Sequence, residues 1–329
     1  LESNMAASLS DSVMAVVQST KGIPQQLSST PGSGMEVAVL EKQGSLQSFP
    51  PVLLHHSSQQ QTLADLQSMI VKLNHTDSAD AITRFIMNRV HQSSGESLIA
   101  PFWLSLRFLA STSRPDIDEF LQVDGSTPLL SRSTMIEELY FVALKILNDT
   151  PSSESHNWQL SALALEAVAL QAQQLGEEFR PELIDALYPV LQFLASNNPA
   201  LQNHAMACLN ILTKSCNYPD TRAMLIENVD YLVNAIGLKL HALDASPYPP
   251  QVLLMMVKLT GAGLIPYLDD VVDSIFGIID MYHGYPKLVE LLFSTLSAIV
   301  SEGVKEPSLL AITQDGEQDR AEGRDVQPL

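Results

Sequence analysis

The chain has 329 residues, of which 46% are hydrophobic and 17% are charged, and its formal net charge at pH 7 is −19. This length is enough for one or two conventional cores or for several stacked repeats. The negative charge argues against a nucleic-acid-binding surface, because there is no basic stripe to displace counterions from phosphates. It equally disfavours binding to an anionic membrane surface.

The cysteines indicate the redox compartment, and the first residue bears on whether the chain is a fragment. The chain has only two cysteines, Cys208 and Cys216, and two thiols without a framework of spacings fit a reducing compartment better than a secreted scaffold. No uncharged apolar run reaches the length that spans a bilayer. The chain begins at Leu1 rather than Met, so we interpret it as a fragment.

The first sixty residues hold little regular structure by pattern. Helical character near residues 12–17 (SVMAVV) leads us to read 1–17 as the end of a preceding repeat. Residues 18–61 lose periodicity and are rich in Pro, Ser, Gly and Gln, which predicts a disordered inter-repeat loop. That loop is either a docking or phosphorylation segment or a tolerated insertion. His55 and His56 lie in it without ligand partners at a suitable spacing, so we expect no metal site there.

Helical spacing resumes at Thr62. Apolar residues at intervals of three and four form one stripe: Leu63, Leu66, Ile70 and Leu73. Ser78 is among the N-cap candidates for the next helix, and SLIAPFWLSLRFLAS (97–111) follows with a proline in its first turn. The stretch 112–132 is ambiguous.

A run of amphipathic segments, separated by short turns with Pro, Asn or Gly, then dominates the chain. The segments are 133–149, 157–175, 179–196, 199–215, 220–243, 249–263, 266–282 and 286–303. Paired helices that recur every ~40 residues are typical of HEAT or armadillo repeats. We therefore predict an all-α, HEAT/armadillo-like solenoid of stacked antiparallel helix pairs over 62–306, followed by a disordered tail at 307–329.

Two of these segments carry well-defined apolar stripes. In 220–243 an unbroken stripe is formed by Leu225, Val229, Leu232, Ile236 and Leu240. In 266–282 the stripe is formed by Leu268, Val271, Val272, Ile275, Phe276 and Ile279. Neither helix can bury its stripe alone, so neighbouring repeats must cover both.

The last third of the chain resembles a known family. IENVDYLVNAIGLKL (226–240), PPQVLLMMVKL (249–259) and the stretch from LIPYLDD to TLSAIV (264–300) occur in the order found in the first of the two TELO-two-interacting proteins. This family is the large HEAT-repeat subunit of the TTT co-chaperone complex, and the last stretch is similar to its fungal members. Family members are considerably longer, so the chain would be an internal portion.

The resemblance implies a function that the helical pattern does not. The chain would be a non-catalytic scaffold subunit that joins the other two TTT subunits. Together with the ninety-kilodalton heat-shock chaperone and its adaptor complex, it would support folding, stability and assembly of phosphatidylinositol-kinase-related protein kinases. A cytoplasmic and nuclear location is expected from that role. The helical surface itself, acidic and extended, suits binding to a helical client.

The acidic cluster Asp269, Asp270 and Asp273 is one candidate partner-binding site. Carboxylates at a helix start interact favourably with the helix dipole, by about 0.3–1 kcal/mol each, which is a sufficient structural reason for them. The functional interpretation is a docking patch for a basic surface of a companion subunit.

Four further residues are candidates for partner contact. Tyr282 and Tyr285 lie in a turn, where they either pack between repeats or meet a partner. Asn228 and Asn234 are the most family-like polar residues, and they either bond to neighbouring inter-helix loops or meet a partner.

No catalytic constellation is recognisable, and we predict that the chain is not an enzyme and needs no cofactor or metal. His204 and Cys208 share a helix face, which we interpret as a core thiol beside a surface histidine. Gly261-Ala262-Gly263 lacks the Gly-Lys-Ser/Thr of a phosphate loop, so we interpret it as a helix C-cap.

Two other scaffold functions remain open. An importin-like HEAT transport adaptor would show regular Asp/Arg ladders and Trp-Asn pairs, whereas Trp103 and Trp158 are isolated here. A regulatory scaffold of a phosphatase would show more uniform repeats.

Overall fold

The computed structural model describes residues 2–20, 48–54, 59–76, 78–111, 132–149, 158–241, 247–281 and 284–305. Every regular element within these ranges is a helix, which confirms the predicted all-α fold. The chain forms two compact units, Leu1–Asn217 and Tyr218–Leu329.

The described part of the first unit is a series of helices. Its elements are α1 (Glu2–Thr20), α3 (Gln60–Asn74), α4 (Ala79–Gln92), η2 (Gly95–Leu98), α5 (Ile99–Ala110), α6 (Arg132–Asp149), α7 (Trp158–Leu175), η4 (Gly176–Glu182), α8 (Leu183–Leu194) and α9 (Pro199–Ser215). Here η marks a 3₁₀ helix.

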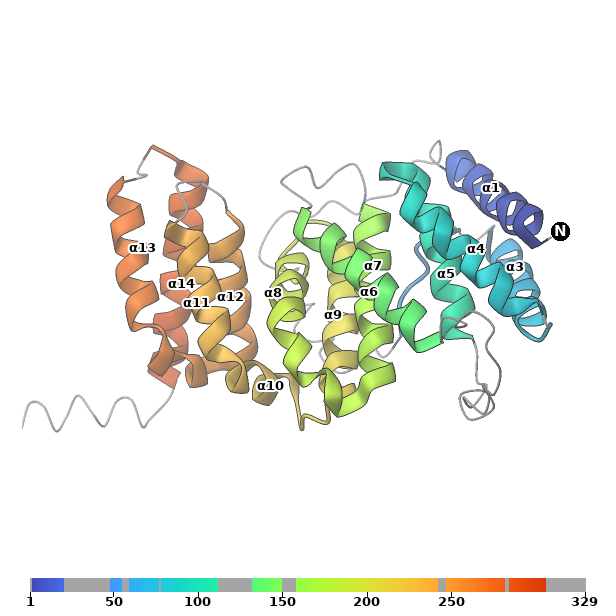
Figure 1. Cartoon of the computed structure of the whole chain (residues 1–329). Coiled ribbons are helices and arrows are strands. Elements are labelled where there is room, and N and C mark those ends of the chain that lie inside the picture. The colour runs from blue at the N-terminus through green and yellow to red at the C-terminus, as the bar shows by residue number, and fades with distance from the viewer. Residues whose placement is uncertain are drawn as a thin grey trace, which may run out of the picture. The chain divides into compact units, whose positions relative to one another are not determined.

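These helices are arranged as stacked pairs (Figure 1). Within each pair α4 packs on α5, α6 on α7, and α8 on α9. Between pairs α5 packs on α7 and α7 on α9, while α4 packs on α6 and α6 on α8. Contact of each helix with its pair partner and with the equivalent helix of the next pair is the pattern predicted for a HEAT or armadillo array.

The interior helices α5 and α7 are apolar on most of their surface. Ten of the twelve residues of α5 are buried, including Trp103, as expected for a helix covered on several sides. In α7 the buried residues include five alanines, whose small side chains let α6 and α9 approach closely. The hydrophobic core of the first unit is centred on these helices.

The boundaries of α9 follow from local chemistry. The Asn198 side chain accepts a hydrogen bond from the backbone N–H of Ala200 (3.0 Å), and Pro199 occupies the first helical position. At the other end the guanidinium of Arg180, from η4, donates to the carbonyl of Cys216 (3.0 Å). The predicted range of this helix, 199–215, is confirmed at both ends.

The segment 179–196 is not one helix, as predicted, but two elements. Pro181 lies in η4, and the α-helix α8 begins only at Leu183. The turn is held by Phe179 and Glu182: the Phe179 ring packs edge-on against Tyr140 (centroids 5.7 Å apart), whose hydroxyl donates to Glu182 (3.2 Å). These contacts to α6 stabilise the tighter 3₁₀ geometry.

The N-terminal segments also differ from the sequence expectation. The helix at the N-terminus extends to Thr20 and packs on α4 and α5. Within 18–61, residues 48–54 are described, and Val52, Leu53 and Leu54 are buried, because they fill space beside the helices. Residues 21–47 and 55–58 of that segment, the ambiguous stretch 112–131 and the predicted tail 307–329 lie outside the described residues.

The second unit repeats the paired arrangement. Its elements are α10 (Thr221–Glu227), α11 (Val229–His241), α12 (Tyr248–Thr260), η5 (Gly261–Tyr267), α13 (Asp269–Met281) and α14 (Pro286–Lys305). In this unit α11 packs on α12 and α13, and α14 packs on α12 and α13 (Figure 1). Gly261 ends α12 with a positive φ of 61°, which confirms the predicted C-cap.

The segment 220–243 is interrupted, contrary to the prediction of an unbroken helix. Asn228 ends α10, and its side-chain amide donates to the carbonyl of Met224 (2.8 Å). A short polar side chain that bonds to the backbone in this way competes with helix propagation. The predicted stripe from Leu225 to Leu240 is nevertheless buried throughout, because α11 resumes at Val229 on the same side.

Candidate protein-binding surface

The three aspartates at the start of α13 are all exposed. Asp269 and Asp270 belong to the first turn, where the helix dipole stabilises carboxylates, and Asp273 follows one turn later. The sequence of α13 contains no lysine or arginine. The structure therefore places the predicted acidic patch in solvent, on a helix without basic residues of its own.

Large apolar side chains lie on the same pair of helices. Five of them, from α13 and α14, have exposed fractions of 55–67%: Phe276, Met281, Phe293, Val300 and Val304. We call these five residues together with Asp269, Asp270 and Asp273 the α13–α14 face. Exposed apolar residues mark an interaction site where they form a contiguous patch, whereas single ones are ordinary.

Phe276 corrects the predicted core stripe of α13. The buried residues of this helix are Val271, Ile275 and Ile278, and Leu268 is buried just before it. Phe276 is 55% exposed, because it lies about 100° around the helix from Ile275, beyond the arc that α11 covers. The sequence thus missed both the exposed aromatic residue and the burial of Ile278.

The predicted tyrosines have different outcomes. Tyr285 is 56% exposed and immediately precedes Pro286, the first residue of α14. Tyr282 lies outside the described residues. The two alternatives for this turn, packing between repeats or contact with a partner, therefore bear on Tyr285, which is exposed on the described part of the turn.

The predicted asparagines also separate. Asn228 is half-buried and bonds within its own turn, to the Met224 carbonyl and to the Tyr218 hydroxyl (3.5 Å). Asn234 is exposed on α11. Asn228 therefore has a structural role at the end of α10, and Asn234 is the one of the pair that is placed on the surface.

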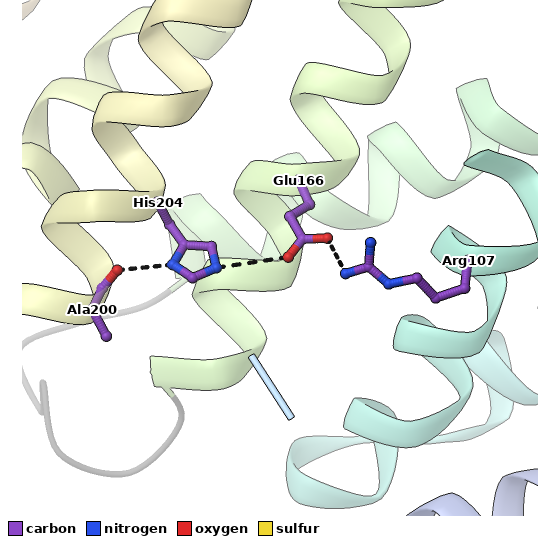
Figure 2. Close-up of polar contacts among 4 residues, drawn as sticks. All are labelled: Arg107, Glu166, Ala200 and His204. Atoms are coloured by element: carbon purple, nitrogen blue, oxygen red, sulfur yellow. Dashed lines mark hydrogen bonds and ion pairs between the residues drawn. The ribbon is translucent and has the colours of Figure 1, made fainter. Parts of the chain in front are cut away.

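A buried polar network, which the sequence analysis missed, crosses three helices of the first unit. Figure 2 shows Arg107 of α5, Glu166 of α7 and His204 of α9 in a line. An Arg107 Nη donates to Glu166 Oε2 at 2.5 Å, and His204 Nε2 lies 3.6 Å from Glu166 Oε1, beyond hydrogen-bond distance. His204 Nδ1 lies 2.8 Å from the carbonyl oxygen of Ala200, to which it donates.

Burial makes this network important for packing. The side chains of Glu166 and His204 are 4% and 1% exposed, so His204 is not the surface residue that we predicted. Glu166 is the one buried carboxylate among the described residues, and a buried charge is tolerated only with partners. The signal in the sequence was Glu166 itself, the only charged residue of α7.

Aromatic rings complete the surroundings of the network. The guanidinium of Arg107 lies over the ring of Trp103, 5.5 Å from its centroid. The ring of Phe49 stacks on His204, with centroids 5.7 Å apart and an interplanar angle of 24°. The cation–π contact favours the guanidinium of Arg107 beside Glu166, and the Phe49 ring packs against the imidazole of His204.

The network does not form a nucleophilic site. Cys208, one turn after His204, is fully buried, and burial raises the pKa of its thiol well above the ordinary value. Burial also raises the pKa of Cys216 to about 11, although the nearby Arg180 partly offsets the increase. The thiolate is the reactive form, so both thiols are poor nucleophiles at neutral pH.

The described helices of the first unit form, among others, two grooves. One, of about 460 Å³, lies between α1, α3 and α4 and is lined mainly by apolar side chains such as Leu9, Val13, Leu66 and Ile82. The other, of about 500 Å³, lies between α4, α6 and α7 and is more polar, with His91, Lys145 and Asp149 in its lining.

Side-chain grouping and helix hydropathy bear on metal binding and membrane insertion in the part of the chain that the structure describes. No group of three or more His, Cys, Asp or Glu side chains there could hold a metal ion. No single described helix has the length and hydropathy needed to cross a bilayer. Only the pair Tyr248–Tyr267 and Asp269–Met281 meets these criteria together, and it is bent by 103°.

The family model and the relatives that this chain is similar to carry the same name. The family model described as TELO2-interacting protein 1 matches residues 187–276, from α8 to α13. TEL2-interacting protein 1 of Saccharomyces cerevisiae is 26% identical over 237 residues, which is 69% of this chain and 23% of that protein. The human TELO2-interacting protein 1 homolog is 31% identical over 150 residues, 46% of this chain and 14% of that protein.

The chain thus matches less than a quarter of the length of these relatives. Among solved structures, a crystal structure of an engineered protein aligns with 82% of this chain and 98% of its own, at 15% identity and a TM-score of 0.32. The residues matched by the family model include Asn228, Asn234, Asp269, Asp270 and Asp273.

Proposed function

We propose that this chain is a member of the TELO2-interacting protein 1 family and a non-catalytic scaffold that binds other proteins through the exposed faces of its helix pairs. The names of the relatives state an interaction of those proteins with TEL2 or TELO2. We extend that interaction to this chain as part of the proposal.

The proposal includes the assembly in which the family takes part. We infer that the chain contributes to the TTT co-chaperone complex and supports the stability and assembly of phosphatidylinositol-kinase-related protein kinases in cytoplasm and nucleus. The other TTT subunits, those kinases and the heat-shock chaperone machinery would be its partners. The family resemblance supports this assignment, and the stacked helix pairs provide an object of the right kind.

The observation that carries the proposal is the position of the family match. Residues 187–276 include most of α8, the whole of α9 and the start of α13, where the acidic residues are exposed. The match therefore covers both the buried helices that determine the fold and part of the surface that is available to a partner. Repeat arrays bind through such extended surfaces.

Co-purification of the whole 329-residue chain with a TEL2-type protein tests the proposal. Both proteins are co-expressed, only the TEL2-type protein carries an affinity tag, and the eluate is analysed by size-exclusion chromatography with light scattering. We expect one complex peak that contains both chains in a fixed ratio. A chain that circular dichroism shows to be helical but that elutes apart from the TEL2-type protein would contradict the proposed partner.

A further inference from the structure

Residues 48–54, the 48–54 segment, pack on the helices of the first unit although they are not helical themselves. The last three residues of the segment, Val52, Leu53 and Leu54, are at most 5% exposed. At its other end the ring of Phe49 stacks on the imidazole of His204, with centroids 5.7 Å apart. In Figure 1 the segment is the blue stretch outside the helices. Side chains near both ends of this short segment are therefore packed against the rest of the unit.

The two ends of the 48–54 segment lie against different parts of the first unit. Leu54 lines the apolar groove between α1, α3 and α4, together with Val13 and Leu66. Phe49 lies on α9, the last helix of that unit, through His204. Five residue steps of extended chain reach at most about 18 Å, which is about the width of two packed helices. The segment thus has the length to pass from the first helices of the unit to its last.

The helices of the first unit pack mainly on their neighbours in the array. The inner helix α5 packs on α7 and α7 on α9, while α4 packs on α6 and α6 on α8. In a repeat array each pair is stabilised by itself and by its neighbours, so distant pairs can open independently. The 48–54 segment is different, because its contacts skip the intervening pair α6–α7.

Phe49 also adjoins the buried polar network. His204 is 1% exposed, and its Nε2 lies 3.6 Å from Oε1 of Glu166 in α7. The other carboxylate oxygen of Glu166 accepts a hydrogen bond from Arg107 in α5. The aromatic ring of the segment therefore rests on a residue whose polar contacts continue through α7 to α5.

The backbone at Leu54 indicates that its surroundings hold the end of the segment in place. Its φ of 56° lies in the left-handed region, which residues other than glycine rarely adopt. The side chain is 4% exposed. A conformation of this kind persists where the surrounding structure determines it, so burial of the Leu54 side chain offsets an unfavourable backbone.

We propose that the 48–54 segment is a clasp that joins α9 to α1 and α3 and makes the two ends of the first unit open together. Phe49 is its anchor on α9, and Leu54 is its anchor in the groove between α1, α3 and α4. Loss of either anchor then loosens both ends, because the coupling between two sites is reciprocal. The clasp is a property of the first unit and does not depend on the proposed partner.

Hydrogen–deuterium exchange of the whole chain, followed by mass spectrometry, tests the clasp with one variant at each anchor. Phe49→Ala removes the stacked ring, and Leu54→Gly removes the other anchor while glycine tolerates the positive φ. In each variant we expect the amides of α9 and those of α1 and α3 to exchange about fivefold faster than in the unchanged chain. The second unit is the internal reference and should change less than about twofold.

Two control variants separate the clasp from ordinary packing. Phe85→Ala removes the same side-chain atoms from α4, where Phe85 is 38% exposed, and should leave the exchange of α9 within about twofold. Phe49→Tyr keeps the ring and should preserve the protection of both ends. Circular dichroism checks the helix content of every variant.

Three results would overturn the clasp. Faster exchange confined to α9 in Phe49→Ala, or to α1 and α3 in Leu54→Gly, would show that each anchor acts only on its own surroundings. Unchanged exchange in both variants would show that the segment does not stabilise either end. Equal acceleration in the second unit would show a general loss of stability instead of a link between the two ends of the first.

Discussion

The helices α7 and α14 belong to the same kind of helix pair but have very different surroundings. In α7 twelve of eighteen residues are buried, whereas in α14 only three of twenty are, so α7 has neighbours on most sides and α14 on one. Their sequences differ accordingly: α7 is rich in alanine, and α14 exposes Phe293, Val300 and Val304.

The difference shows how one architecture separates stability from binding. The hydrophobic contribution of a residue scales with the area it removes from water, so the interior pair holds the first unit together. The exposed apolar residues of α14 contribute little to folding, and they leave area that a partner can remove from water. Substitutions in the two helices should therefore affect different measurements.

The largest expected effect on stability follows truncation of a leucine in α7. Leu163 is fully buried, so Leu163→Ala should lower the free energy of unfolding by about 3 kcal/mol through lost burial and a residual cavity. Fluorescence-monitored denaturation in urea measures this, because Trp103 and Trp158, the only tryptophans, both lie in the first unit.

The matched substitution on α14 is Phe293→Ala. Its side chain is 55% exposed, so we expect the free energy of unfolding to change by less than about 1 kcal/mol. Circular dichroism measures this unfolding, because the second unit has no tryptophan. A loss as large as that of Leu163→Ala would mean that the α14 side chain is covered in the free protein, and the comparison would fail.

The rate of thiol labelling distinguishes the buried interior of the first unit, which holds Cys208 and Cys216, from the exposed side of α14. At pH 8 iodoacetamide should react with Cys216 about two orders of magnitude more slowly in the folded than in the unfolded chain, because its pKa of about 11 leaves little thiolate. The labelling rate should rise with pH up to about 11. Both thiols are buried, and Cys208 should react more slowly still, since its pKa is raised further.

A cysteine placed at Val300 provides the exposed control for this measurement. Val300→Cys on α14 should label at the rate of a free thiol while the two native thiols remain protected, as mass spectrometry of the intact chain would show. Rapid labelling of Cys208 under native conditions would indicate that α9 opens readily, against the packing described above.

Loss of a polar contact should destabilise the protein more on α7 than on α14. Glu166→Gln removes a buried charge next to Arg107 and His204 and should lower the free energy of unfolding by about 2 kcal/mol. The partly exposed pair Glu302–Lys305 on α14 (2.5 Å) is the control, and Glu302→Gln should cost less than about 0.5 kcal/mol. Similar costs in urea denaturation would show that Glu166 is not part of a stabilising network.

Helix positions in the later part of the chain could be predicted from sequence because local signals agree with burial. At α9 an N-cap asparagine, a proline at the first helical position and an apolar stripe all indicate the same start. At α14 Pro286 likewise marks the first residue. The all-α fold follows from the repetition of such segments.

The errors arise where periodicity does not contain the deciding interaction. The apolar stripe continues across Asn228 although the helix does not, because a side-chain bond to the Met224 carbonyl ends α10. The width of the buried arc depends on which neighbours are present, so the exposure of Phe276 is invisible in α13 alone. The burial of His204 depends on Glu166 and Phe49, which are distant in sequence.

The candidate surface could be predicted only in part for the same reason. Asp269, Asp270 and Asp273 are recognisable as a local cluster, and the structure finds them exposed. The apolar half of the α13–α14 face could not be distinguished from core, because a helical wheel shows that a side is apolar but not whether another helix covers it.

The alanines of α7 have a consequence for inherited variation. Ala162, Ala164, Ala167, Ala169 and Ala172 are all at most 1% exposed, and they set the distance at which neighbouring helices lie. A missense change to valine or a larger residue at any of them adds volume to a densely packed core. Such overpacking typically lowers the free energy of unfolding by about 1–3 kcal/mol. In a population survey, these five codons should therefore tolerate glycine or serine more readily than any larger residue, whereas the outward positions of α14 should vary freely in size.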